Sequence, residues 1–377
     1  MKETKPIKVV FGLNDFLVGG MQRQFSEQVR HFNRERFEII LITLFQFPDK
    51  DNMYGALPTD LKVHMLSFSG FFDVRSWWKL FRLLQRIQPD LVVSSLFFSN
   101  TIFRILKPFV GYASIAREHN TFADRLSPWQ RMIDRVLSHF SYCIVAVSST
   151  VADFTSKQEG IPRKKFVVIH NGVDLHKVQR ELDQLPSKNE LRAELGFLQA
   201  DSILLNVARL TDQKNHLLLI EGFAVFHNAY PAYKLAIVGS GKLREELETY
   251  ARTKGVGDAV IFFGHRDDVW RFYKMSDAFV SASQIEGLSN SYLEACAASL
   301  PLVATNTAGT DELLLDGKNG YIISEQTPQA VVRALSRLQS SETQTLGISA
   351  RETAEKFSIQ RTVGRYEALF VDAMQNV

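Results

Sequence analysis

The sequence predicts an α/β protein built from two doubly wound domains in tandem. Short apolar runs alternate with amphipathic helical stretches along the chain, and after one polar stretch the same alternation begins again. Such alternation is typical of parallel sheets whose strands are joined by crossover helices. The length of 377 residues suits two domains of ordinary size. A hydrophobic fraction of 45% with 23% charged residues excludes a disordered chain.

The first half of the chain contains the runs expected for one sheet and its helices. The apolar runs predicted to be buried strands are residues 7–11, 38–44, 91–95, 113–117 and 143–147. Helical patterns lie between several of them, at residues 22–32 and 75–87. In the second of these patterns, Trp77, Leu80 and Leu84 fall on one face and Arg82 and Arg86 on the opposite face, which predicts an amphipathic helix.

The second half repeats the pattern. Its predicted strands are residues 203–208, 235–238, 260–264, 278–281, 302–305 and 321–323. The polar stretch 177–189, which contains Pro186, is interpreted as a linker leading into a surface helix. We therefore expect a first domain over residues 1–178, a second over 179–359, and a final helix over about 360–377 that packs back on the first. Because such sheets bind ligands beyond the carboxyl ends of their strands, two facing sheets would share a central cleft.

Composition and charge indicate a soluble cytoplasmic protein. Two cysteines, Cys143 and Cys296, make no disulfide framework. The apolar stretch 101–116 is interrupted by Arg104, Lys107 and Pro108, so no transmembrane helix is expected. The net charge is +3, but residues 1–175 hold 23 Lys and Arg against 16 Asp and Glu, which gives +7 and leaves −4 for the rest. This asymmetry fits an anionic partner, such as a lipid surface or a phosphate-bearing acceptor, or a chance difference between two solvated surfaces.

The most informative segment covers residues 284–320. Glu286 lies in a loop after a predicted strand, and Glu294 follows eight residues later. A helix is predicted to begin at Ser289 or Asn290, and the N–H groups of a helix start can receive a diphosphate. The two carboxylates can accept hydrogen bonds from sugar and ribose hydroxyls. The alternative for Glu294 is an acid favoured at a helix start by the helix dipole.

Two cations follow the first strand of the second set. Arg209 and Lys214 come after residues 203–208 and are therefore expected at the carboxyl end of that strand. Two cations at this place can hold a pyrophosphate and stabilise its charge as the bond to the sugar breaks. The alternative is a pair of solvated loop residues, which is the commoner state of Arg and Lys.

Glycines mark two further turns. Gly19 and Gly20 follow the first predicted strand, where they permit close approach to a ligand or make a tight strand-to-helix turn. Gly239 and Gly241 resemble a dinucleotide fingerprint whose third glycine is replaced by Arg244. The incomplete motif favours a turn beside the donor over an NAD site.

His119 follows a predicted strand of the first domain, so it can contact the sugar from the side opposite the donor phosphates, although a lone histidine is more often structural. No HExxH, paired-Cys or strand-end Asp-x-Asp pattern occurs, since Asp49 and Asp51 lie in a polar loop. GxSxG and GxxxxGK[ST] motifs are also absent. We therefore expect neither a metal nor another cofactor.

Together these segments resemble the family-4 retaining glycosyltransferases, which have the GT-B fold. The resemblance spans nearly the whole chain. It rests on Gly19-Gly20, Glu118-His119, residues 170–174, Arg209 with Lys214, Gly239-Ser240-Gly241, the Glu286 to Glu294 motif, and Glu312. The sequence departs from the family pattern at His170, Ser289 and Ala298-Ser299, where the family commonly has Pro, Pro, and a small residue with Gly. These departures remove no charged group and leave the donor preference open.

The resemblance implies roles at the matching positions. Arg209 and Lys214 would bind the donor diphosphate, Glu286 the sugar hydroxyls, and Glu294 the ribose. Other contacts are implied for Gly19 and Gly20 near the phosphates or acceptor, Gly239 beside the donor, Arg266 with His265 at the base, Gly287, Leu288, Ser289 and Asn290 at sugar and phosphate, and His119 at the sugar near the reacting carbon. Members of the family need no metal for catalysis.

The predicted function is transfer of a hexose or N-acetylhexosamine, with retention, from a nucleotide-diphosphate sugar that we expect to be UDP-linked. The acceptor would be a hydroxyl of a glycan or lipid-linked molecule in envelope polysaccharide, lipopolysaccharide or glycoconjugate synthesis, and no nucleic acid is expected. The alternatives are an epimerase or hydrolase of the same fold, or a nucleotide-sugar-binding protein without turnover.

Aromatic residues near basic ones in the first domain predict a peripheral site on the anionic inner face of a membrane. The alternative is that most of these aromatic side chains are core. The residues concerned are Phe71, Phe72, Trp77, Trp78, Phe97, Phe98 and Phe103, and the core alternative is preferred for Trp77 and Phe81.

Overall fold

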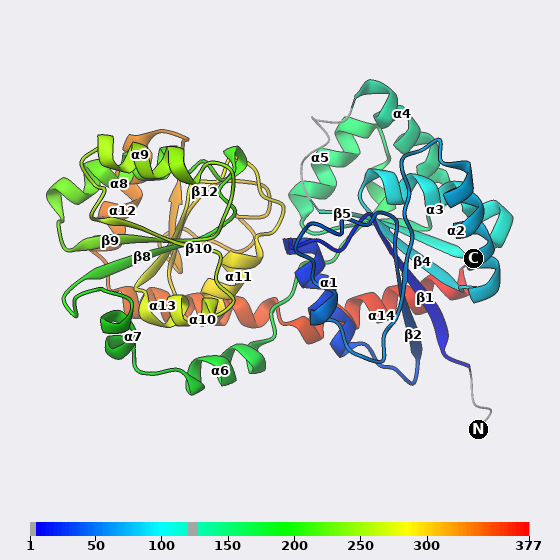
Figure 1. The fold of residues 1–377 in the computed structure, drawn as a ribbon, viewed down its shortest axis with the longest axis horizontal. Helices are drawn as coiled ribbons and strands as arrows, with labels where there is room; N and C mark the ends of the chain where they lie inside the picture. The colour runs from blue at the N-terminus through cyan, green and yellow to red at the C-terminus, as the bar shows by residue number, and fades with distance from the viewer. Residues whose placement is uncertain (1–4, 120–126, 377) are drawn as a thin grey trace. The chain divides into compact units, whose positions relative to one another are not determined.

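The computed structural model describes residues 5–119 and 127–376, which fold into two units that each contain one parallel sheet (Figure 1). The first unit is Met1–Gly172 with Ile359–Val377, and the second is Val173–Ser358. The boundary expected at residue 178 lies inside a helix, α6 (Leu175–Gln184). The units therefore divide slightly before the polar stretch that suggested the boundary.

The first unit has a seven-stranded sheet in the order β3-β2-β1-β4-β5-β6-β7. All of its neighbouring strands run parallel. The strand order changes direction at β1, so the β1/β4 pair is the topological switch point, where ligands of such sheets bind. The strands are β1 (Ile7–Leu13), β2 (Phe37–Thr43), β3 (Lys62–Met65), β4 (Leu91–Ser95), β5 (Ala113–Glu118), β6 (Cys143–Ala146) and β7 (Phe166–Val168).

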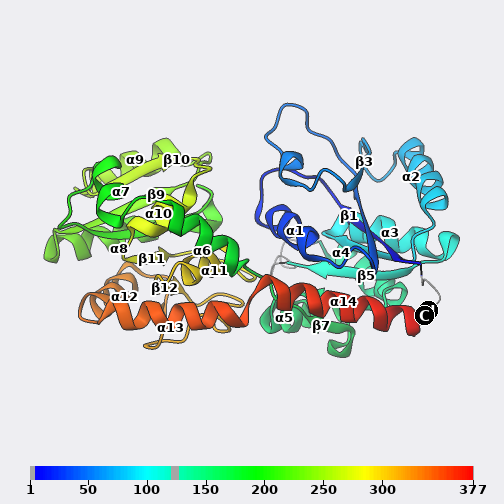
Figure 2. The same cartoon turned by 90° about the horizontal axis from the view of Figure 1, so that it is seen from below.

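Helices cover both faces of this sheet. They are α1 (Gly20–His31), α2 (Val74–Ile87), α3 (Phe97–Val110), α4 (Pro128–Leu137), α5 (Ser149–Glu159) and α14 (Ile359–Gln375), with short turns η1 (Tyr54–Ala56), η3 (Ser138–Phe140) and η4 (Arg163–Lys165). α1 and α14 lie side by side over one face (Figures 1 and 2). There Phe370 of α14 contacts Phe11 and Phe32, with ring centroids 6.3 and 5.8 Å away. The last helix of the chain is thus part of the first core.

The second unit has a six-stranded parallel sheet in the order β10-β9-β8-β11-β12-β13. Its switch point lies between β8 and β11. The strands are β8 (Ser202–Val207), β9 (Tyr233–Val238), β10 (Val260–Gly264), β11 (Ala278–Ser281), β12 (Leu302–Thr305) and β13 (Gly320–Ile323). The other elements are α6, α7 (Lys188–Glu194), η5 (Asp212–Lys214), α8 (His216–Ala229), α9 (Arg244–Thr253), α10 (Val269–Met275), α11 (Asn290–Ala297), α12 (Pro328–Gln339) and α13 (Thr343–Lys356).

The faces of the second sheet bury different residues. α8, α9 and α12 pack on the face that contains Leu204 and Val303. On the other face, Phe279 of β11 lies between Tyr273 of α10 and Tyr292 of α11, with ring centroids 6.2 and 5.7 Å away. α10 and α11 therefore anchor on the strand next to the switch point.

The structure confirms the α/β class and corrects three details. The strands β3 and β7 were not predicted, because both are short and lie at sheet edges. The expected linker at the start of residues 177–189 is instead the helix α6, whereas the helix expected after it is present as α7. The Asp174 carboxylate accepts from Lys177 N at 3.0 Å to cap α6, and Ser187 and Glu190 form the capping box that starts α7.

The aromatic residues of the first unit divide between core and surface. Phe103 is fully buried, and Trp77 and Phe81 pack against the same core cluster, as the core alternative expects. Phe72 and Trp78 are exposed. Among the described residues, no helix combines the length and the apolar character needed to cross a bilayer.

Candidate active site

The switch point of the second sheet gathers the charged residues predicted to bind the donor. Arg209 and Lys214 follow the carboxyl end of β8, and Glu286 follows the carboxyl end of the neighbouring strand β11. Asn206 of β8 links the two strands, since its Nδ2 donates to the Val280 carbonyl at 2.7 Å. Residues that are 72 or more positions apart in the sequence therefore meet at one sheet edge.

Lys214 and Glu286 form an ion pair at this edge. Lys214 Nζ donates to Glu286 Oε1, and only 15% and 10% of the two side chains are exposed. The loops that carry them are joined by two bonds through Gln213, whose carbonyl accepts from Gln284 N and whose Nε2 donates to the Ile285 carbonyl, both at 2.8 Å. Lys214 is thus a buried, positioned cation and not a solvated loop residue.

Arg209 lies on the same loop after β8 as Lys214, and its side chain is in a different state. Its side chain is exposed, and within the described part of the chain it makes no ion pair. An exposed guanidinium on the loop that also carries a positioned ammonium provides charge and several N–H donors for an anion at the end of β8.

The helix predicted at Ser289 or Asn290 is α11, which begins at Asn290 with Ser289 as its N-cap residue. Gly287 and Leu288 precede it in the loop after Glu286. Glu294 lies in the second turn, where its Oε2 accepts from the Tyr273 hydroxyl at 2.8 Å. Tyr273 was not predicted as a site residue, because its place in the aromatic segment of α10 predicts core packing and gives no sign of the hydroxyl contact.

Gly239 has a structural reason that the sequence analysis did not contain. Its φ is +142°, and a Cβ there would lie 1.9 Å from the Ala208 carbonyl oxygen. Only glycine lets the loop after β9 lie against the backbone that leads to Arg209. The Leu210 N–H then donates to the Ser240 carbonyl at 2.9 Å. The residue therefore shapes the cation-bearing loop through its backbone.

Arg266, predicted near the base, follows the end of β10. Its guanidinium donates twice to the Asp268 carboxylate, at 2.7 and 2.6 Å, and this bond raises the pKa of Arg266. The guanidinium also lies 5.5 Å from the ring centre of Phe272. Two partners hold this side chain in place at a strand end.

The first unit places its predicted residues at the carboxyl edge of its own sheet. Gly19 is the N-cap residue of α1, in the loop after β1, with Gly20 as the first helical residue, and His119 follows β5. The Nε2 of His119 is buried without a hydrogen-bond partner among the described residues. Burial and the nearby Arg117 cation hold the pKa of His119 well below its usual value, so the imidazole is neutral at pH 7.

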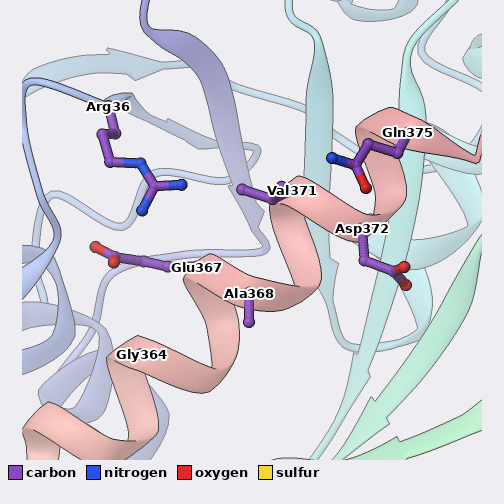
Figure 3. A pocket seen from close by; sticks show the side chains of 7 residues that line it. All are labelled: Arg36, Gly364, Glu367, Ala368, Val371, Asp372 and Gln375. Carbon is purple, nitrogen blue, oxygen red and sulfur yellow. The ribbon is translucent and has the colours of Figure 1, made fainter.

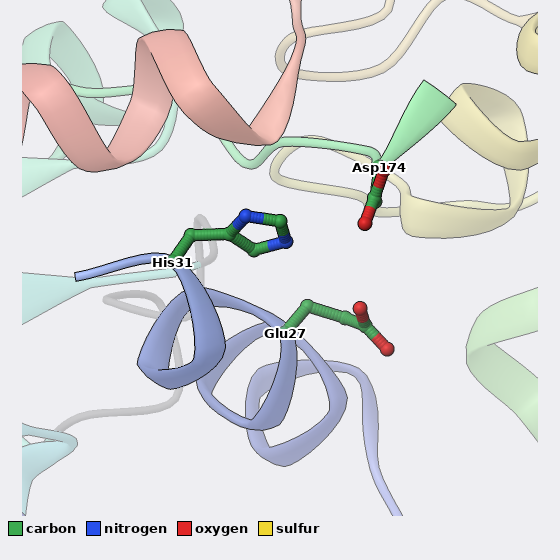
Figure 4. Close-up of side chains that lie close together, drawn as sticks. All are labelled: Glu27, His31 and Asp174. Carbon is green, nitrogen blue, oxygen red and sulfur yellow. The ribbon is translucent and has the colours of Figure 1, made fainter. Parts of the chain in front are cut away.

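Potential metal ligands do not form a set within either unit. Glu27 and His31 lie one turn apart on α1 (Figure 4), and two side chains fall short of the three or four of a protein metal site. Asp174, of the second unit, is engaged as the N-cap of α6. Among the described residues, neither unit taken alone gathers three such ligands.

A surface cavity of about 400 Å³ lies elsewhere in the first unit, between Arg36 and one side of α14 (Figure 3). Its acids already have structural partners, because Glu367 accepts from Asn33 N at 2.7 Å and Asp372 from the Tyr142 hydroxyl at 2.6 Å. Arg36 immediately precedes β2, so the cavity is at the amino ends of strands. Doubly wound sheets bind their ligands at the opposite ends.

Comparison with known proteins identifies the chain. Residues 18–177 match the family described as Glycosyltransferase Family 4, and residues 187–358 match Glycosyl transferases group 1. A UDP-Gal:alpha-D-GlcNAc-diphosphoundecaprenol alpha-1,3-galactosyltransferase of Escherichia coli is 24% identical over 96% of this chain and 95% of its own length. EpsD of Bacillus subtilis, a glycosyltransferase by assignment, is 33% identical over 47% of this chain, and the match spans about half of that relative, 47%.

The fold also matches solved structures. Anabaena Alr3699/HepE in complex with UDP superposes with a TM-score of 0.83 at 17% identity, over 97% of this chain and 100% of that chain. At this identity the likeness establishes the fold. The two parallel sheets and the two family matches agree, and the chain is therefore a glycosyltransferase of family 4 with the GT-B fold.

Proposed function

We propose that the chain transfers a hexose or N-acetylhexosamine from a UDP-sugar, with retention and without a metal, to a hydroxyl of a glycan or lipid-linked acceptor. The observation that carries the proposal is the convergence of Arg209, Lys214 and Glu286 at one switch point. Anabaena Alr3699/HepE has been solved with UDP and with UDP-glucose, and the Escherichia coli relative is named for a UDP-Gal donor and a diphosphoundecaprenol-linked acceptor. Both names support this donor and acceptor class.

The two cations take the diphosphate. Lys214 is already oriented by Glu286, and Arg209 has an exposed guanidinium on the loop that follows the same strand. Charge on the departing diphosphate grows as the sugar–oxygen bond breaks, so cations fixed beforehand stabilise the transition state more than the ground state. This arrangement supplies the charge that a divalent cation would otherwise supply.

The two acids select the hydroxyls. Glu286 would exchange its ammonium partner for sugar hydroxyls once the diphosphate engages Lys214, and both partners stay hydrogen-bonded in the exchange. Glu294, oriented by Tyr273, would accept from the ribose hydroxyls. Carboxylates accept and never donate when ionised, which suits neutral hydroxyl donors.

The transfer step needs no carboxylate nucleophile. The bond between the anomeric carbon and the β-phosphate oxygen breaks, and the acceptor oxygen bonds to the same face of that carbon. The acceptor proton passes to the departing β-phosphate oxygen. Because the acceptor oxygen attacks from the side of the leaving group, the anomeric configuration is retained. The neutral imidazole of His119 is suited to a hydrogen bond with the sugar, as the family resemblance implies.

A donor panel followed by acceptor-dependent turnover tests the proposal. Thermal unfolding should shift upward with UDP more than with GDP or ADP, and one UDP-hexose or UDP-N-acetylhexosamine should shift it further. With a lipid-linked acceptor extract, UDP release should require acceptor, survive chelation by EDTA, and give an α-linked product from an α-linked donor by NMR. Release of free or altered sugar without acceptor would identify a hydrolase or an epimerase. Binding without any product would identify a sugar-nucleotide-binding protein without turnover.

A further inference from the structure

One helical layer of the first unit exposes large apolar side chains that other described residues do not cover. It consists of α2, α3 and α4, in which α3 contacts both neighbours. Seven apolar side chains at or near these helices are between 54% and 97% exposed: Phe72, Val74, Trp78, Phe109, Trp129, Met132 and Val136. We call this set the α2–α4 face. Contiguous exposed apolar surface usually marks an interaction site.

The residues of the α2–α4 face follow helical periodicity on the outer side of their helices. Val74 and Trp78 are one turn apart on α2, whose inner side buries Leu80 and Leu84. Trp129, Met132 and Val136 form a stripe along α4, and the ring of Trp129 lies 6.1 Å from that of Phe97 of α3. These helices therefore have two apolar sides, whereas a helix that only covers a sheet needs a single apolar side.

The α2 side of this face is positively charged. Arg75, Lys79, Arg82 and Arg86 are exposed on α2, and the one acid next to them is Asp73, which caps the start of the helix. The acid of α4, Asp134, is buried and paired with Arg104 at 3.1 Å. Arg82 lies over the Trp78 ring at 5.7 Å, so cation and aromatic group are presented together.

We propose that the α2–α4 face docks the enzyme on a bilayer that contains anionic phospholipid. The aromatic and Met side chains would enter the boundary between head groups and acyl chains, and the exposed cations would lie at the lipid phosphates. A second copy of the chain is a poor occupant, because a self-complementary interface would bring two sets of cations together. The exposed apolar residues of the second unit, Leu198, Val225, Leu315 and Ile348, lie on separate elements of the chain.

Vesicle flotation of the full chain, without donor or acceptor, tests the proposal. The protein should float with vesicles of phosphatidylcholine and phosphatidylglycerol in equal parts, stay behind with phosphatidylcholine alone, and detach in high salt. Trp78→Ser with Phe109→Ser and Met132→Ser should abolish flotation. The matched control is Leu198→Ser with Val225→Ser and Ile348→Ser, which removes equally exposed apolar groups and should float normally.

The contribution of the cations to vesicle binding and the depth of the tryptophan side chains in the bilayer are measured separately. Lys79→Glu with Arg86→Glu should weaken vesicle binding about 30-fold, since each surface cation contributes about fivefold. Arg180→Glu with Lys318→Glu, exposed cations of the second unit, should leave binding unchanged. Brominated lipid should quench the fluorescence of the wild type, and quenching should fall strongly in Trp78→Phe with Trp129→Phe, which retains Trp77 and Trp270.

Several outcomes would overturn the docking proposal. They are no flotation of the wild type, equal flotation of the face and control variants, or quenching that survives loss of both tryptophans. A wild-type dimer that the Ser variants convert to a monomer in sedimentation velocity, with no vesicle binding, would make the face an interface between copies. UDP binding is measured without vesicles, so failure of the donor site and failure of this surface are separate results.

Discussion

The two sheets end in opposite electrostatic surroundings. At the carboxyl edge of the second sheet, Lys214 and Glu286 are charged and paired, and Arg209 is exposed. At the corresponding edge of the first sheet, burial raises the pKa of Glu118 to about 8 and lowers that of His119. An ion pair of opposite charges thus lies at the second edge, whereas burial shifts two groups of the first edge toward neutrality.

The contrast indicates a division of labour. A diphosphate is an anion and needs fixed cations, which only positioned and paired residues can supply at low cost in reorganisation. A sugar hydroxyl is neutral and can both donate and accept, so the neutral imidazole of His119 can meet it in addition to the carboxylates of the second edge. The proposed donor site therefore belongs to the second edge, and the predicted sugar contact of His119 belongs to the first.

Removing a cation of the second edge should cause the largest loss of transfer activity. Lys214→Ala takes away a positioned charge at the proposed diphosphate, so kcat/KM should fall about 1,000-fold and the thermal shift caused by UDP should disappear. Because this change leaves the buried Glu286 unpaired, it also destabilises the fold.

Arg209→Ala provides the control for folding. Arg209 is exposed, so its loss should leave the melting temperature within a few degrees of the wild type while kcat/KM falls about 100-fold. If both variants transferred sugar at wild-type rates, the donor site would be misplaced.

Glu286→Gln should separate binding of the donor sugar from binding of the donor diphosphate. The amide keeps the size and a carbonyl acceptor but loses the charge, so kcat/KM for the UDP-sugar should fall about 100-fold. Inhibition by UDP itself should change less than about tenfold, since UDP lacks the sugar. Equal losses for UDP and UDP-sugar would show that Glu286 acts only by holding Lys214.

Much of this architecture could be predicted from sequence because apolar periodicity is local information. The runs at 91–95, 260–264, 278–281 and 302–305 coincide with strands, and α11 begins where Ser289 and Asn290 predicted. Edge strands such as β3 bury little surface and carry a weak signal, and capped polar helices such as α6 look like linkers when only apolar pattern is counted.

Side-chain contacts between distant segments could not be predicted in the same way. Spacing brought Glu286 and Lys214 to two strand ends, but their ion pair depends on β8 and β11 being neighbours, which strand order alone decides. The Tyr273 hydroxyl reaches Glu294 across 21 positions, and nothing in the segment around Tyr273 indicates it. The roles assigned to the site residues stay predictions until donor binding is measured.

Tyr273→Phe should produce a smaller effect at the second edge. The change removes only the hydroxyl that donates to Glu294, so the KM for the donor should rise about five- to tenfold with little change in kcat. Tyr230→Phe, at a partly buried tyrosine packed on the core around α8, is the matched control and should leave the donor KM unaltered. A fall in kcat alone would argue against a positioning role for Tyr273 in donor binding.

Changes near the first edge should alter the pH dependence of the melting temperature, and they should have the smallest effect on sugar transfer. Behind Glu118, the carboxyls of Asp134 and Glu159 and the guanidinium of Arg104 are buried together, with Arg131 of α4 also acting on Glu159. Burial and mutual repulsion raise the pKa of Glu159 to about 9 and that of Glu118 to about 8. Buried Arg104 balances the charge of one carboxylate, so the remaining carboxyls of the cluster keep their protons in the folded state.

The direction of the pH dependence follows from these raised values. A carboxyl that binds its proton more tightly in the folded state contributes stability that is complete below its unfolded pKa, near 4.5, and is lost as the pH rises through its folded value. The melting temperature should therefore fall between about pH 5 and pH 9. Glu159→Gln, which mimics the protonated acid, should flatten this fall, whereas Glu352→Gln at an exposed site of α13 should not. A wild-type melting temperature that rises over this range would mean that the carboxyls are ionised in the folded protein and that the two sheet edges do not differ as described.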